Sequence, residues 1–362
     1  MWLCGDHLSR FSQHGREEDL SGFGYLLLEY VMTGDPLSSS WRQHRHEHDK
    51  RRNLFRGISR ILLDLSDVPL PRIGSWRMDR RGVISLTNRP LLDITMLWNR
   101  HGIPSDIPRV RHPLPSRVSP LTCNLKGRTY ASAGSYLQDV LACQNTRLRY
   151  QPNSILGRPD GIFQLSALTA LRALLPKYWT QSLQNGPFVL TLPDLHQSNM
   201  FVDDEWNIVG VIDFEFAPVQ PQQTVGVPHW LSDKSIDELV GTELDEYKEL
   251  YDQFVDILEE AEAKRGNGHS FSKRLREDWQ TGRLWYNAAL RSSNGFPLIF
   301  ENNLQPRFFP KFDPDAEGMT LTRLWGEDHE DFIAEKLRDK AEYDKHIRRI
   351  FAMAKATHSG QG

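Results

Sequence analysis

The sequence predicts an α+β fold with a mostly helical body and one small β-hairpin. Between residues 188 and 212, three short apolar runs are separated by turn-forming residues, a pattern typical of strands joined by tight loops. After about residue 235, apolar residues recur at helical spacing, as in DELVGTELDEYKELYDQFVDILEEAEAKR. A hydrophobic content of 39% supplies enough apolar side chains for a core, and 362 residues fit one large or two modest domains.

Composition excludes several classes of protein. A formal charge of −3 and a pI near 6.5 argue against a dedicated nucleic-acid-binding protein, which usually has a strongly basic domain. The odd, widely spaced cysteines Cys4, Cys123 and Cys143 form neither a disulfide framework nor a zinc pattern, which favours a reducing compartment. The N-terminus is unlike a signal peptide, and the most apolar run, Phe23–Met32, is too short to span a bilayer. We therefore expect a cytoplasmic protein with no membrane, nucleic-acid or specific protein partner.

The first elements follow from local patterns. Residues 23–32 are apolar and end at a Thr-Gly-Asp-Pro breaker, which predicts a buried strand. The serines at 38–40 can cap a helix that contains Trp41. The charged stretch 44–56 is interpreted as a solvated helix face rather than a nucleic-acid or lipid patch, because acidic residues are mixed into it. It leads into a helix that ends before Pro69.

The middle of the chain predicts a hairpin and two helices. Residues 73–78 and 82–86 flank the turn at Asp79–Arg81 and are expected to pair as a hairpin. Residues 102–131 are rich in Pro, Arg and Ser and are expected to form a loop. A helix over 133–147 with Ser132 or Ser135 as its cap follows, and then one over 160–175 capped by Asp160.

Acidic and amide side chains stand at defined points of the segment that begins at Phe188. A short apolar strand leads to Asp194, and Asn199 follows five positions later. A turn and a further strand then lead to Asp213, fourteen residues after Asn199. Phosphoryl transfer from ATP needs a group that orients the attacking hydroxyl and oxygen ligands for Mg²⁺. An aspartate directed at the acceptor, with an amide and a second carboxylate directed at the metal, meets both needs.

This segment resembles the aminoglycoside phosphotransferase and choline kinase-like family, in which a D-L-H-x-x-N loop precedes an I-D-[FW]-E metal motif. Residues 194–199, DLHQSN, and 212–215, IDFE, match these motifs. Residues 24–31 are similar to the family's hinge strand, and 85–91 and 148–153 are similar to segments of its fungal branch. The resemblance covers most of residues 22–350. It implies a protein-kinase-like fold, mainly the helical C-lobe with a small catalytic hairpin and only a remnant of the N-lobe sheet.

The resemblance also implies a role for each matching residue. Asp194 would act as the catalytic base or orient the acceptor, and His196 would brace the catalytic loop. For His196, a hydrogen-bonded structural role is the interpretation we favour. Asn199 and Asp213 would bind Mg²⁺, with Glu215 supporting the metal site.

The hinge and the cofactors are implied in the same way. Backbone groups around Glu29 and Val31 would bind adenine, and this is favoured over the alternative in which Glu29 and its neighbours are plain members of a buried strand. ATP is the implied co-substrate and Mg²⁺ the implied metal. The histidines at 44, 46 and 48 are two positions apart and do not share one helix face, which argues against a metal site there.

The chain departs from the family in two places. Leu192 stands where many members have a histidine, two positions before Asp194. The 28 residues before Glu29 contain no lysine, since the first is Lys50, and no Gly-rich turn flanked by strands. A kinase uses such a lysine and loop to hold the ATP phosphates. The sequence is therefore expected to be truncated at its N-terminus relative to the family.

Three regions and two functions follow from this reading. Residues 1–36 are expected to form the N-lobe remnant and hinge, 37–355 a C-lobe with a helical substrate-binding subdomain, and 356–362 a disordered tail. The first hypothesis is an ATP- and Mg²⁺-dependent O-phosphotransferase that acts on the hydroxyl of a small molecule of unknown identity. The second is a catalytically degenerate, pseudokinase-like binding or scaffold protein.

Overall fold

The computed structural model describes residues 33–79, 81–90, 128–179, 181–214, 217–266 and 270–359. The predicted hinge strand with Glu29 and Val31 lies outside these ranges, as does Glu215. The helices are α1 (Leu37–His44), α2 (His48–Ser66), α4 (Ala133–Tyr150), α5 (Arg158–Tyr178), α6 (Gly241–Arg265), α7 (Phe271–Thr281), α8 (Arg283–Arg291), α9 (Phe296–Ile299), α10 (Gln305–Phe308), α11 (Met319–Trp325) and α12 (His329–Ser359). Two π-helical turns cover Phe300–Leu304 and Pro314–Gly318.

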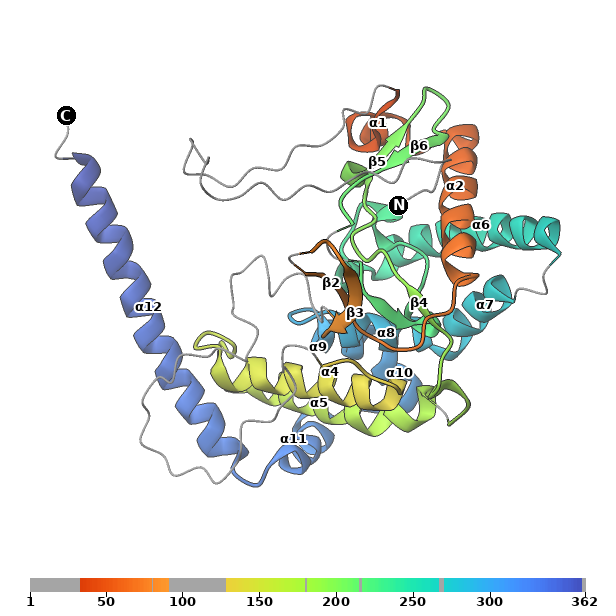
Figure 1. Ribbon diagram of the computed structural model, residues 1–362. Helices are drawn as coiled ribbons and strands as arrows, with labels where there is room; N and C mark the ends of the chain where they lie inside the picture. Colours follow the sequence, from red (N-terminus) through yellow and green to blue (C-terminus); the bar gives the residue numbers. More distant parts are fainter. Residues whose placement is uncertain are drawn as a thin grey trace.

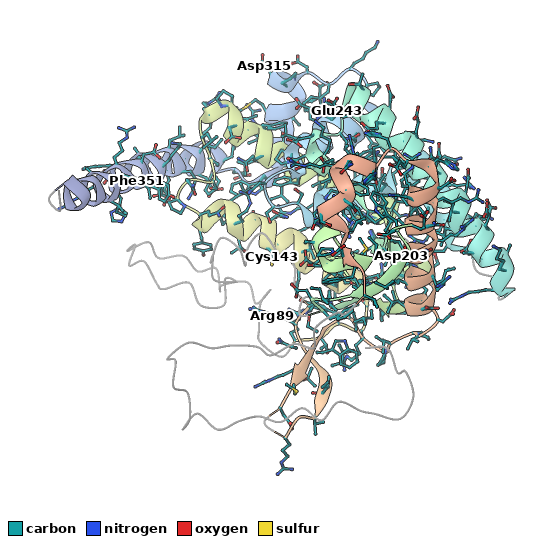
Figure 2. The ribbon with its side chains drawn as sticks, turned by 90° about the horizontal axis from the view of Figure 1, so that it is seen from above. Arg89, Cys143, Asp203, Glu243, Asp315 and Phe351 are labelled. Carbon is teal, nitrogen blue, oxygen red and sulfur yellow. The ribbon has the colours of Figure 1, made fainter. Side chains whose placement is uncertain are left out.

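The strands form small antiparallel sheets beside this helical body, which confirms the predicted α+β class (Figure 1). They are β1 (Asp35–Pro36), β2 (Ser75–Met78), β3 (Ile84–Asn88), β4 (Phe188–Leu190), β5 (Met200–Val202), β6 (Ile208–Val211) and β7 (Val219–Pro221). One sheet has the order β1-β5-β6, while β2 pairs with β3 and β4 pairs with β7. The predicted hairpin around Asp79 is confirmed as β2–β3, whose side chains extend from the body in Figure 2.

Aromatic and aliphatic side chains join the helices into one core. Phe55 of α2 meets Phe254 of α6 edge to face, with ring centroids 5.4 Å apart. Helix α5 carries buried leucines along one side and packs against α4, α8 and α11. Figure 1 shows α12 running from this core away from the body, and Ile350 and Phe351 near its end are exposed. No helix in the described ranges is both long and apolar enough to cross a bilayer.

Two predicted helix caps are wrong, and in each case a proline lies within two residues of the helix start. Helix α1 starts directly after Pro36, whose φ of −55° suits a helix start, so the serines at 38–40 lie inside the helix. Helix α5 starts at Arg158 with Pro159 in its first turn and Gly157 at the cap position. The Asp160 carboxylate instead accepts the Leu156 backbone N–H at 2.7 Å. The Ser132 cap of α4 is confirmed, since its Oγ accepts the Ser135 N–H at 3.3 Å.

The hairpin that carries the candidate site is packed closely against the N-terminal helices. Gly34 adopts a φ of 79°, and a Cβ there would lie 2.6 Å from the Val202 carbonyl oxygen on β5. Gly57 lets α2 approach β6, because a Cβ at this position would meet the Ile208 side chain at 2.8 Å. Both contacts fix the hairpin relative to the helical body.

Candidate active site

The catalytic loop begins where β4 leaves its partner strand. Val189 pairs with Gln220 of β7, and Thr191 extends the pairing because its N–H donates to the Pro218 carbonyl at 2.9 Å. Pro193 then interrupts the strand, since proline cannot donate to a sheet. The chain turns at this point and presents Asp194 at the end of a rigid, paired strand.

Asn199 closes the loop onto Asp194. Its side-chain Nδ2 donates to the Asp194 backbone carbonyl at 2.9 Å and to the Asp194 carboxylate at 3.3 Å. A short 3-10 turn over Gln197–Asn199 brings the two residues together, and the Asn199 N–H donates to the His196 carbonyl at 2.9 Å. Among the described residues, these bonds leave the Asn199 Oδ1 with only a 3.4 Å contact from the Ser198 hydroxyl. The amide oxygen is therefore available to a cation.

The β5–β6 hairpin returns the second aspartate to the same place. Met200 pairs with Val211, and the Ile212 N–H donates to the Asn199 carbonyl at 3.0 Å. Asp213 follows with a φ of 64°, a left-handed conformation that non-glycine residues rarely adopt. Residues 192–195 and 211–214, together with Ala217, line a small, open pocket that contains both aspartates.

The two carboxylates influence each other electrostatically. The pKa of Asp194 is raised above its ordinary value, first by burial and then by the negative charge of Asp213. The hydrogen bond from Asn199 and the nearby His196 oppose this rise. The two carboxylates of the pocket and the amide of Asn199 beside Asp194 are hard-oxygen groups of the kind that Mg²⁺ prefers.

Part of the predicted metal set lies outside the described residues. Within the described ranges, no three His, Cys, Asp or Glu side chains are grouped as metal ligands. The predicted metal set is Asn199, Asp213 and Glu215, and Glu215 is not described. The structure thus brings Asp194, Asn199 and Asp213 together and leaves Glu215, Glu29 and Val31 as predictions.

His196 lies against an indole ring. Its imidazole centroid is 5.6 Å from that of Trp230, and in the described part of the chain no hydrogen bond to this ring is found. We favoured a hydrogen-bonded structural role for His196, but the described residues show ring packing against Trp230 instead. Burial lowers the pKa of His196, while the negative charges of Asp194 and Asp233 act to raise it.

Trp230 is a site residue that the sequence reasoning missed. Its Nε1 donates to the Leu195 carbonyl at 2.7 Å, next to Asp194. Its ring meets Trp41 at 5.3 Å, and Trp41 stacks on Trp206 at 5.5 Å. This column of three tryptophans supports the catalytic loop through the hydrogen bond from Trp230. The dipeptide His229-Trp230 after a proline was the available signal, but no spacing rule connects it to residue 195.

Comparison with known proteins agrees with this geometry. The phosphotransferase enzyme family (APH) matches residues 13–222, which is more than half of the chain. A shorter match, 51% identical over 45 residues, is to clavilactone A biosynthesis cluster protein Y of Ampulloclitocybe clavipes. It covers 12% of this chain and 11% of that protein. No solved structure matches the chain significantly. Because the catalytic loop and the hairpin are in place and the family matches more than half of the chain, the chain belongs to the phosphotransferase enzyme family.

Proposed function

We propose that this protein transfers the γ-phosphoryl group of ATP to a hydroxyl group of a small molecule, with Mg²⁺ as cofactor. The observation that carries the proposal is the arrangement in which Asp194 and Asp213 line one pocket and Asn199 is hydrogen-bonded to Asp194. Family membership supports phosphoryl transfer as the reaction class and does not favour the degenerate alternative. ATP, Mg²⁺ and the acceptor belong to the proposal.

Asp194 is the group that handles the acceptor proton. Its carboxylate accepts a hydrogen bond from the acceptor hydroxyl and takes the proton as that oxygen bonds to the γ-phosphorus. The bond from phosphorus to the bridging oxygen breaks, and ADP leaves with the electron pair. A pKa raised by burial makes Asp194 a stronger base than an exposed aspartate would be.

Asn199 and Asp213 are the residues that would hold Mg²⁺, with Glu215 supporting them. When bound, the ion neutralises charge on the phosphate oxygens. Asn199 performs a second task, because its Nδ2 holds the Asp194 carboxylate in position while its Oδ1 remains available. Glu29 and Val31 would bind adenine through their backbone groups.

ATP turnover over a panel of hydroxylated small molecules tests the proposal. Asp194→Asn keeps the shape of the side chain and removes the base, so turnover should fall roughly 10²–10⁴-fold. Asp204→Asn is the matched control, since Asp204 lies exposed in the hairpin turn ten positions away and should leave the rate unchanged. Equal activity of wild type and Asp194→Asn would rule out the role assigned to Asp194.

A further inference from the structure

The backbone that follows Asp194 is held by three hydrogen bonds. The Asp194 carbonyl accepts the Asn199 Nδ2 at 2.9 Å, and the Leu195 N–H donates to the Leu192 carbonyl at 3.1 Å. The Leu195 carbonyl accepts the Trp230 Nε1 at 2.7 Å. The first two bonds come from the loop itself, whereas the third comes from a residue 35 positions further along the chain. Together they fix both peptide units after Asp194, and the direction of its side chain depends on them.

The bond from Trp230 is made away from water. Trp230 is only 6% exposed, and Leu195 is buried as well. A hydrogen bond in such surroundings is electrostatically stronger than the same bond in water. If the indole N–H were removed, the Leu195 carbonyl would lose a partner that water could not easily replace. The bond is therefore a firm attachment of the catalytic loop to the rest of the protein.

Two further tryptophans hold the Trp230 ring in place. Trp41 of α1 meets it edge to face at 5.3 Å and stacks on Trp206 at 5.5 Å. Trp206 lies in the turn between β5 and β6 at a φ of 62°, which bulky residues rarely adopt, and its Nε1 donates to the Ser40 hydroxyl at 3.0 Å. Figure 1 shows α1 beside this hairpin. The column thus ties the catalytic loop to the hairpin that carries Asp213.

Trp230 also contacts the side chain of His196. The two ring centroids lie 5.6 Å apart with the ring planes inclined at 57°. One indole therefore touches both residues that follow Asp194, Leu195 through its N–H and His196 through its ring. Any shift of Trp230 would be passed to this part of the loop.

Trp41 shows what a ring of the same column does without such a bond. It is 3% exposed, and within the described residues its Nε1 has no hydrogen-bond partner. Trp41 and Trp230 both contribute packing, but the hydrogen bond to the loop comes from Trp230. The pair therefore allows packing and positioning to be separated by experiment.

We propose that Trp230 is a positioning residue for phosphoryl transfer, whose indole N–H acts through the Leu195 carbonyl to keep the Asp194 carboxylate directed at the acceptor hydroxyl. This role rests on the proposed function of Asp194. A displacement of about 1 Å at a reacting group can lower the rate roughly 10²-fold. Among the described residues, those that line the pocket do not include Trp230, so it acts on the rate of the chemical step and not on substrate binding.

The kinetic test compares Trp230→Phe with Trp41→Phe, using the hydroxylated compound that wild type phosphorylates fastest. Both variants keep an aromatic ring, but only Trp230→Phe removes a hydrogen bond to the loop. Trp41→Phe reports what the loss of packing alone does to stability and kcat. Relative to it, Trp230→Phe should lower kcat by a further 10-fold or so. The KM for ATP and for the acceptor should stay within about twofold of wild type. Equal kcat in the two variants, or a KM raised in Trp230→Phe alone, would overturn the assignment.

Amide hydrogen exchange separates this inference from the proposed function, because it needs no substrate. The Leu195 and Asn199 N–H groups, bonded within the loop, report its order, and those of α5 report global unfolding. Relative to α5, Trp230→Phe should speed exchange of the two loop amides roughly 10-fold, whereas Trp41→Phe should leave them close to wild type. If this occurs but no compound is phosphorylated, the proposed function fails and the attachment of the loop by Trp230 stands. Unchanged loop exchange in Trp230→Phe refutes the attachment, whether or not the protein is active.

Discussion

Asp213 occupies the most strained position of the candidate site. Its φ of 64° places a non-glycine residue in the left-handed region, and the nearby Asp194 adds repulsion between like charges. Such strain costs on the order of 1–3 kcal/mol and persists where the fold imposes it. A residue held this way at the end of a paired hairpin is positioned in advance for a ligand.

Substituting Asp213 separates strain from function. Asp213→Gly relieves both the backbone strain and the repulsion, so the free energy of unfolding without Mg²⁺ should rise by about 1 kcal/mol in urea titrations. Asp213→Ala keeps the strain without the local polar side chain and should not show this gain. Equal stability of the two variants would mean that the backbone of Asp213 is not strained in solution.

His229 makes stability depend on pH. Its folded-state pKa of about 4 lies below the ordinary 6.5, so between these values the unfolded chain binds the proton more readily. The contribution of neutral His229 to the free energy of unfolding is fully present above pH 6.5 and is lost as the pH falls toward 4. The melting temperature of His229→Gln should therefore fall less than that of wild type as the pH drops from 6.5 to 4. His46→Gln is the matched control and should behave like wild type. Parallel declines in wild type and His229→Gln would contradict the lowered pKa.

At the residue scale, the sequence predicts the site residues that lie close together along the chain and misses those that tertiary structure brings to the site. Asp194, Asn199 and Asp213 were found because one loop and one hairpin carry all three. Trp230 reaches the catalytic loop from the short 3-10 turn His229–Ser232, which no local sequence pattern connects to residue 195, so only the tertiary contact reveals it.

Among the elements, the hairpin depends on how closely the chain before α1 approaches β5. Gly34→Ala places a Cβ 2.6 Å from the Val202 oxygen at a φ that already disfavours side chains. Gly82→Ala is the matched control, because Gly82 has a φ of 80° and no atom within 4 Å of its Cβ position. We expect Gly82→Ala to cost about 1 kcal/mol, and Gly34→Ala about 1–3 kcal/mol more, in chemical unfolding. Similar losses for both would show that this approach is not close in solution.

Helix and strand positions were largely predictable, whereas their ends were not. Alternating and helical patterns placed β2–β3, β5–β6, α4 and α6 correctly. Helix α7 shows why ends fail, since its first N–H groups are capped by Glu262, nine residues earlier on α6. Helix α12 likewise continues through Ser359, past residue 355 where the helical region was expected to end. Caps of this kind come from tertiary structure and leave no local signature.

For the whole molecule, one continuous core links the N-terminal helices to the site. The Trp206–Trp41–Trp230 column joins the hairpin turn, α1 and the catalytic loop, and Trp206 also donates to the Ser40 hydroxyl at 3.0 Å. Substituting these rings should therefore disturb stability and catalysis together.

The central claim is that the loop and hairpin bind Mg²⁺ and ATP as one site, and calorimetric titration with Mg²⁺·ATP tests it most directly. Wild type and the Asp204→Asn control should bind with micromolar affinity that disappears when the metal is chelated. Asn199→Ala should lose this metal-dependent binding, because it removes both the ligand oxygen and the bond that positions Asp194. The claim would be contradicted if wild type did not bind Mg²⁺·ATP. It would also be contradicted if Asn199→Ala bound ATP as tightly as wild type, with or without the metal.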